Sequence, residues 1–212
     1  RTYPNGREAA HILGQVNRDG VGIAGIEKSM HSKLARGEDI TLSIDLGLQS
    51  VIRSEIQKQI EKFEAIGGAG VLLDIKTGEM LAVASLPDFN PNQFSQAKDD
   101  ARFNRATKGL YEMGSTFKPL TATMGFDLGI IDQNMKFDVK KKYLKISDYE
   151  RYKGDGMYDV ERIIVESSNI STAKIATMIG KKNQQDFFNK LGFDSRLSIE
   201  NKEAASLLGN KN

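Results

Sequence analysis

A run of helical periodicity followed directly by two strand-like runs is the feature that most restricts how this chain folds. Apolar residues recur at helical spacing from Leu48 to Phe63. Asp45 stands where an N-cap belongs, and Gly67 and Gly68 are expected to end the helix. Two β-type runs then flank the turn residues KTGE, which predicts a hairpin. We therefore expect an α+β fold, with helices packed on an antiparallel sheet.

The rest of the chain adds a short strand and several helices to this frame. The segment ITLSI, at 40–44, is strand-like, whereas the periodicity of 159–167, 170–180 and 184–192 predicts three helices. Residues 1–38 are rich in glycine and too short to hold a core of their own. We expect that segment to pack on another part of the chain or to belong to a module that precedes it.

Composition excludes several kinds of function. Thirty basic residues against 28 acidic residues give a formal charge of +2, so a nucleic-acid partner is not indicated. Cysteine is absent, which excludes disulfides and thiolate metal sites, and neither His11 nor His31 has metal-ligand spacing around it. We expect no metal and no cofactor. No apolar stretch approaches the roughly 20 residues that cross a bilayer.

Ser115 and Lys118 are the residues with the clearest chemical potential. Ser115 follows a glycine, stands near a helix start and has an apolar continuation behind it. Residues i and i+3 of a helix share a face, so the lysine amine can reach the serine hydroxyl and act as its base if it is neutral. Free N–H groups and the positive dipole end at a helix start also stabilise developing negative charge.

The bare S-x-x-K pattern is weak, because Ser95 with Lys98 and Ser171 with Lys174 also match it. Ser95 lies in a polar loop, and Ser171 is expected to be a neutral filler of an amphipathic helix, with its lysine solvated. Local features alone also leave open that Ser115 only caps a helix, since serine is a favoured N-cap.

Longer motifs carry a family resemblance. STFK at 115–118 is followed by SSN at 167–169, and this order is the signature of serine penicillin-binding enzymes. The segments LSIDLGLQSVIRSEI, LDIKTGEMLAVASLPDFNPN and ESSNISTAKIA resemble class B (monofunctional) penicillin-binding proteins. FNRATKGLYEMGSTFK is most similar to their septal, FtsI-like peptidoglycan transpeptidases. The resemblance implies the transpeptidase fold shared with serine β-lactamases.

The resemblance also implies roles for four residues. Ser115 would attack the penultimate D-alanine carbonyl of a peptidoglycan stem peptide, D-Ala-D-Ala, and Lys118 would take its proton. Ser167 would relay a proton to the leaving amine, and Asn169 would hydrogen-bond the substrate amide. The amine of a neighbouring stem peptide would then discharge the acyl-enzyme, and β-lactams would acylate the same serine. The N–H of Ser115 would belong to the oxyanion hole.

The third element of the family signature, K-T-G, is expected after the other two. The KTG at Lys76–Gly78 precedes Ser115 and is predicted to be an ordinary hairpin turn, and neither K-T-G nor K-S-G follows Asn169. We therefore expect residues 1–38 to be the remnant of an N-terminal pedestal module, and 39–212 to be a partial transpeptidase domain without its final strand region. Such a fragment would be poorly active.

The resemblance places the function at the periplasmic side of the inner membrane, through an anchor outside this chain, in septal synthesis with other division proteins. Two alternatives remain: a β-lactamase or D,D-carboxypeptidase that uses water, and a non-enzymatic division-complex module that binds partners through residues 11–28. For single residues, Ser167 and Ser168 could only cap the following helix, and Asn169 could be a turn residue with positive φ.

Overall fold

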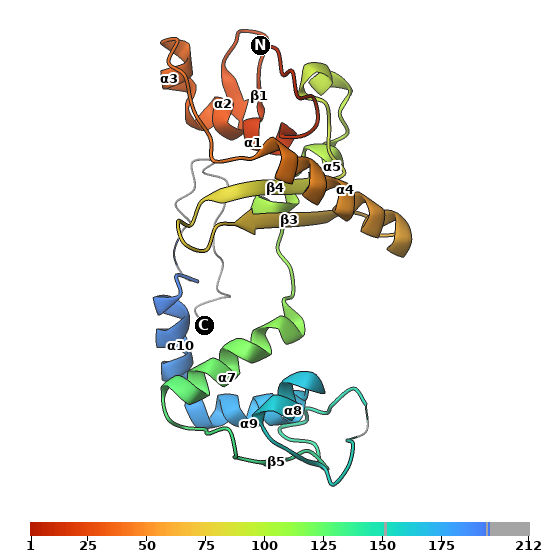
Figure 1. Cartoon of the computed structure of the whole chain (residues 1–212), viewed down its shortest axis with the longest axis vertical. Coiled ribbons are helices and arrows are strands. Elements are labelled where there is room, and N and C mark those ends of the chain that lie inside the picture. The colour runs from red at the N-terminus through yellow and green to blue at the C-terminus, as the bar shows by residue number, and fades with distance from the viewer. Residues whose placement is uncertain (151, 194, 196–212) are drawn as a thin grey trace. The chain divides into compact units, whose positions relative to one another are not determined.

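The computed structural model describes residues 1–150, 152–193 and 195. Within these residues the chain forms two compact units, Arg1–Leu110 and Tyr111–Ser195 (Figure 1). Each unit has buried hydrophobic clusters of its own. The predicted boundary between a pedestal remnant at 1–38 and a transpeptidase domain at 39–212 is not the boundary between these two units, and it stays a prediction.

The long helix of the first unit, α4 (Leu46–Phe63), begins as predicted. The Asp45 carboxylate accepts a hydrogen bond from the Leu48 N–H at 2.9 Å, so it satisfies one of the donors left over at the helix start. The predicted end is wrong. Glu64 follows the last turn in a left-handed conformation, with φ 51°, and Gly68 is already the first residue of a strand.

The predicted hairpin is confirmed by β3 (Gly68–Leu73) and β4 (Met80–Leu86), which pair antiparallel with Val71 opposite Val83. Lys76–Gly78 lies in the turn, where an Asp74 carboxylate oxygen accepts from the Lys76 N–H at 2.7 Å. This KTG is therefore a turn, as predicted. Helix α4 packs on the hairpin, and a Cβ at Gly70 would lie 2.9 Å from isoleucine side chains of α4, which explains a glycine there.

The prediction of a strand at 40–44 is wrong. The segment touches the hairpin at its end, where the Asp45 N–H donates to the Leu81 carbonyl at 2.9 Å. Further along β4, however, the Val83 N–H and carbonyl are both bonded to the side-chain amide of Gln49, at 2.8 and 2.9 Å. Because this buried amide occupies the backbone groups that another strand would need, the pairing stops.

The N-terminal segment packs on the hairpin, as expected for a segment without its own core. It comprises α1 (Ala10–Leu13), β1 (Gln15–Val16), β2 (Gly22–Ala24), α2 (Gly25–Ser29) and α3 (His31–Ala35), with β1 antiparallel to β2. Ala9, Ile12 and Ile26 form a cluster with Val83 of β4. After the hairpin the unit is completed by the 3-10 helix η1 (Pro91–Gln96), α5 (Asp99–Arg102) and α6 (Arg105–Lys108).

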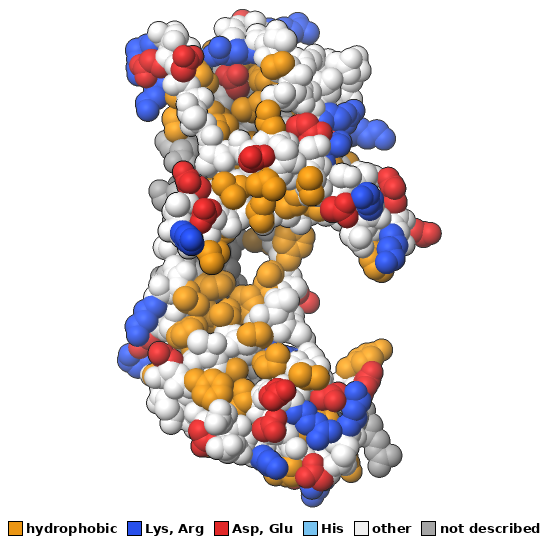
Figure 2. All heavy atoms as spheres, in the orientation of Figure 1, with side chains coloured by type: hydrophobic (Ala, Val, Ile, Leu, Met, Phe, Trp, Pro, Cys, Tyr) orange, Lys and Arg blue, Asp and Glu red, His pale blue; other side chains and the backbone are white. Residues whose placement is uncertain are grey.

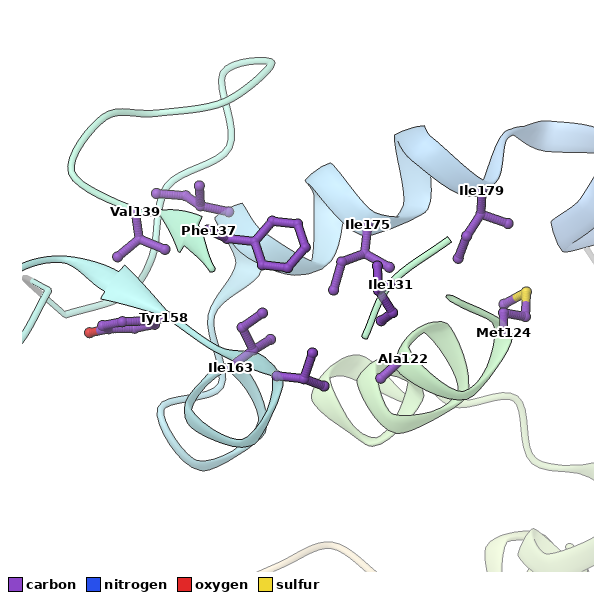
Figure 3. Packing of buried hydrophobic residues seen from close by; sticks show 11 residues of the cluster. Ala122, Met124, Ile131, Phe137, Val139, Tyr158, Ile163, Ile175 and Ile179 are labelled. Carbon is purple, nitrogen blue, oxygen red and sulfur yellow. The ribbon is translucent and has the colours of Figure 1, made fainter. Parts of the chain in front are cut away.

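The second unit is mainly helical. It comprises η2 (Gly114–Phe117), α7 (Lys118–Asp127), β5 (Phe137–Asp138), β6 (Met157–Tyr158), α8 (Val160–Val165), α9 (Asn169–Ile179) and α10 (Lys181–Lys190). Its three last helices confirm the predicted ones. Helices α7 and α9 pack through a core that includes Met124, Ile163 and Ile175, and the short β5–β6 ladder covers one end of it (Figure 3). This core fixes the start of α7 against the start of α9.

Hydrophobic side chains also reach the surface. On β3, Val71, Leu72 and Leu73 are 38–52% exposed, and Figure 2 shows hydrophobic atoms gathered over this strand. No helix among the described residues has the length and apolar character needed to span a membrane.

Candidate active site

Ser115 and Lys118 are brought together by the turn that leads into α7. Ser115 lies in the 3-10 turn η2, and Lys118 is the first residue of α7. Side chains three residues apart lie over one another in a 3-10 turn, and Lys118 Nζ is 3.0 Å from Ser115 Oγ. Ser115 makes no capping hydrogen bond at either helix, so the alternative of a simple helix cap is not supported.

Ser167 completes a triangle with this pair. Lys118 Nζ contacts Ser167 Oγ at 2.8 Å and the Ser167 carbonyl oxygen at 2.5 Å. Ser167 Oγ in turn lies 2.8 Å from Ser115 Oγ. The Lys118 nitrogen can make hydrogen bonds to all three oxygens as an ammonium, and as a neutral amine it can donate two and accept one from a serine hydroxyl. The STFK and SSN motifs are therefore in direct contact.

The two neighbouring serines of SSN have different environments. Ser168 is fully buried and caps α9, because its hydroxyl accepts from the Ser171 N–H at 3.1 Å. Ser167 is exposed and adopts a left-handed φ of 52°. That conformation costs a non-glycine residue about 1–2 kcal/mol, so the surrounding contacts must maintain it. The capping alternative is thus right for Ser168 and wrong for Ser167.

Asn169 is the first residue of α9, and its exposed side chain borders the same cavity. Its Nδ2 donates to the Ser147 carbonyl at 3.2 Å. The alternative of a positive-φ turn residue is wrong, since the left-handed residue in this turn is Ser167. An amide has two donors and an acceptor, so Asn169 retains groups that can face a ligand.

Asp148 was not predicted as a site residue, yet it holds the SSN turn. Its Oδ1 accepts from the N–H groups of Asn169 and Ile170 at 2.5 and 3.0 Å, and its Oδ2 accepts from Ser168 Oγ at 2.9 Å. It lies 20 positions before Ser168, in a charged loop without regular periodicity. A carboxylate in such a loop looks like any solvated charge until the fold brings it to a helix start.

The three side chains of the triangle open into a cavity of about 220 Å³. Its wall also contains the following residues: Asp148, Tyr149, Glu150, Tyr158, Glu166 and Asn169. Lys118 is only 9% exposed, and this burial lowers the pKa of its amine, while the charge of Asp148 partly opposes the shift. A buried amine with a lowered pKa beside a hydroxyl can serve as a base for that hydroxyl.

The other Ser–Lys pairs lie in different surroundings. Ser171 is fully buried in α9, where its hydroxyl lies 3.2 Å from Ser168 Oγ, and it does not line the cavity. Lys174 Nζ donates to the Asp138 carbonyl. Ser95 lies in the surface helix η1, which leaves Ser115 as the serine of this pattern that lines the cavity with its lysine.

Comparisons with known proteins agree with this geometry. Residues 68–210 match the family model "Penicillin binding protein transpeptidase domain". The "Probable peptidoglycan D,D-transpeptidase FtsI" of Caulobacter vibrioides is 36% identical over 97% of this chain and 36% of its own length. The PenA protein of Neisseria gonorrhoeae, similarly named, is 30% identical over 93% of this chain and 39% of its own length.

Solved structures show the same fold. The PBP2 of Pseudomonas aeruginosa, crystallised with WCK 5153, matches 99% of this chain and 54% of its own with a TM-score of 0.81 and 27% identity. The chain thus spans little more than a third of the curated relatives and about half of this crystallised protein. The expected transpeptidase fold is confirmed, and the chain belongs to the penicillin-binding protein transpeptidase family, with relatives of the FtsI and PenA type.

Proposed function

We propose that this chain supplies the acylating residues of a serine D,D-transpeptidase that cross-links peptidoglycan stem peptides. The observation that carries the proposal is the triangle of Ser115, Lys118 and Ser167, with 3.0 and 2.8 Å between the reacting atoms, at the floor of an open cavity. The names of the relatives, as peptidoglycan D,D-transpeptidases, support the substrate class.

The proton has a continuous route through this triangle. With Lys118 neutral, the Ser115 hydroxyl donates to Nζ, and the serine oxygen attacks the penultimate D-alanine carbonyl as its proton passes to the amine. The resulting ammonium faces Ser167 Oγ at 2.8 Å. Ser167 passes a proton to the nitrogen of the leaving D-alanine, the C–N bond breaks, and an ester on Ser115 remains.

The second half of the reaction reverses this proton path. The amine of a neighbouring stem peptide attacks the ester, gives its proton to the base, and regenerates the Ser115 hydroxyl as the new amide forms. Asn169, whose side chain borders the cavity, hydrogen-bonds the backbone amide of the donor peptide. A β-lactam takes the same first step: its ring C–N bond opens, and no leaving group departs.

The setting of this reaction belongs to the same proposal. The similarity to FtsI-type proteins supports a role in septal wall synthesis during cell division. We infer that the parent protein works with other division proteins on the periplasmic side of the inner membrane. Hydrolysis by a β-lactamase or carboxypeptidase is the competing outcome at the same serine.

The test is covalent labelling of the full-length protein with a penicillin, followed by intact mass measurement. The expected product is one adduct that carries the whole penicillin mass, absent in Ser115→Ala. Ser95→Ala is the matched control, because it changes an exposed serine of the same S-x-x-K pattern and should label normally. Labelling of Ser115→Ala would refute the assignment, and rapid loss of the adduct to water would favour the hydrolase.

A further inference from the structure

Asp148 binds the start of α9 with both of its oxygens. The first N–H groups of a helix lack partners inside the helix, and here Asp148 Oδ1 accepts from two of them, at Asn169 and Ile170. Its Oδ2 accepts from the hydroxyl of Ser168, which itself caps Ser171. A side chain from a distant loop and the N-cap residue therefore act on the same helix end, where negative charge is also favoured by the dipole.

The residue held in place by this arrangement is Ser167. It precedes the clamped residues directly, and its left-handed φ of 52° is a conformation that a serine would leave if its neighbours allowed. Towards α8, the Ser167 N–H donates to the Ile164 carbonyl at 3.2 Å and the Ser168 N–H donates to the Ile163 carbonyl at 3.0 Å. The turn is thus fixed between the end of α8 and the carboxylate of Asp148, and this keeps Ser167 Oγ 2.8 Å from Ser115 Oγ.

We propose that Asp148 is a positioning residue for acylation, which holds the Ser167–Asn169 turn closed on Ser115 and Lys118 through its three hydrogen bonds. This inference rests on the proposed function of Ser115. Asp148 makes no hydrogen bond to Ser115 Oγ, and it positions the SSN turn through its contacts with Ser168, Asn169 and Ile170.

Asp148 also influences Lys118 by its charge. Burial is the larger effect and lowers the pKa of Lys118, whereas the nearby carboxylate raises it. The other titratable side chains on the cavity wall are Tyr149, Glu150, Tyr158 and Glu166, and Glu166 is paired with Lys153 at 2.7 Å. Replacing Asp148 by a neutral residue should therefore make the amine easier to deprotonate, whereas a purely structural role would not affect the amine.

The experiment measures the rate of acylation of the full-length protein by a fluorescent penicillin across a pH series. Asp148→Ala removes all three hydrogen bonds, and we expect its plateau rate to fall on the order of 10- to 100-fold, as for a small misplacement of reacting groups. Asp148→Asn retains a carbonyl acceptor for the two N–H groups, so its plateau should fall less. The pH at which the acylation rate of Asp148→Asn rises to its plateau should be lower than in the parent protein.

Asp132→Asn is the matched control. Asp132 also accepts from two backbone N–H groups, those of Asn134 and Met135 at 2.7 and 3.0 Å, but it lies in an exposed loop and does not line the cavity. This variant should show the plateau and the pH midpoint of the parent protein. A shift of the same size in Asp132→Asn would overturn the assignment to Asp148.

Two further results would also overturn the inference. One is a parent-like plateau and midpoint in both Asp148 variants. The other combines two observations. The fall in the acylation rate of Asp148→Ala disappears when the rate is expressed per folded molecule, as judged by circular dichroism, and the pH midpoint of the rate of Asp148→Asn is unshifted. Labelling of Ser115→Ala would refute the proposed function itself. Parent-like behaviour of the Asp148 variants alone would contradict the role of Asp148 and would not affect the function proposed for Ser115.

Discussion

Replacing Ser168 with alanine should destabilise the second unit without removing a reacting group. The fully buried hydroxyl caps α9 through the Ser171 N–H and donates to Asp148. Loss of a serine N-cap costs about 1 kcal/mol, and loss of a hydrogen bond to a charged group about 1.5–3 kcal/mol. Because Asp148 retains two N–H donors, the lower part of this range applies, and we expect about 2–3 kcal/mol in total.

The adjacent change, Ser167→Ala, should do the reverse. Ser167 is exposed and caps no helix, so its loss should cost less than about 1 kcal/mol of stability. It removes the hydroxyl that we propose passes a proton from Lys118 to the leaving group, however, and loss of such a proton relay lowers rates about 100- to 10,000-fold. Ser168→Ala should acylate within about tenfold of the parent, since two of the Asp148 contacts remain.

The pair can be compared by urea unfolding, followed by circular dichroism, and by the rate of labelling with fluorescent penicillin. A shift of the urea midpoint at constant slope reports stability, and the labelling rate reports the chemistry. Equal destabilisation of Ser167→Ala and Ser168→Ala, or labelling of Ser167→Ala at the parent rate, would contradict these expectations.

Two other predictions concern Lys118 and the core. Since burial lowers the pKa of Lys118, the acylation rate should rise with pH as the amine loses its proton, and it should level off below the pH range in which an exposed lysine titrates. Lys118→Arg should show almost no acylation at any pH, because arginine keeps its proton. Both can be measured in a stopped-flow pH series. Gly125→Val should destabilise the fold by about 1–3 kcal/mol in urea, because even a Cβ at this position of α7 would lie 2.7 Å from the Ile131 side chain; an unchanged midpoint would show that the core can relax around it.

The parts of the fold predicted correctly depend on signals between near neighbours in sequence. Asp45 before an apolar run indicates a capped helix, and KTGE between β-type runs indicates a hairpin, because caps and turns are decided within a few residues. The strand predicted at 40–44 failed for the opposite reason. Its pairing depends on whether the edge of β4 is available, and the Gln49 amide occupies that edge.

The site residues also separate into those that local sequence predicts and those that depend on distant contacts. Ser115 and Lys118 are three residues apart, so a single helical turn predicts their contact, which the structure shows at 3.0 Å. The meeting with Ser167 came from a family resemblance and needs the packing of α7 on α9, which no local pattern encodes. Asp148 has neither a motif nor a fixed spacing, so only the folded loop reveals its bonds to the turn.

The Gln49 amide determines which edge of the β3–β4 hairpin can pair with a further strand. By offering one donor and one acceptor to Val83, it imitates the peptide group of a neighbouring strand and closes that side of β4 with a side chain. An incoming chain that extends the sheet by backbone pairing is thereby steered to the flank of β3, where Val71, Leu72 and Leu73 stand at the surface.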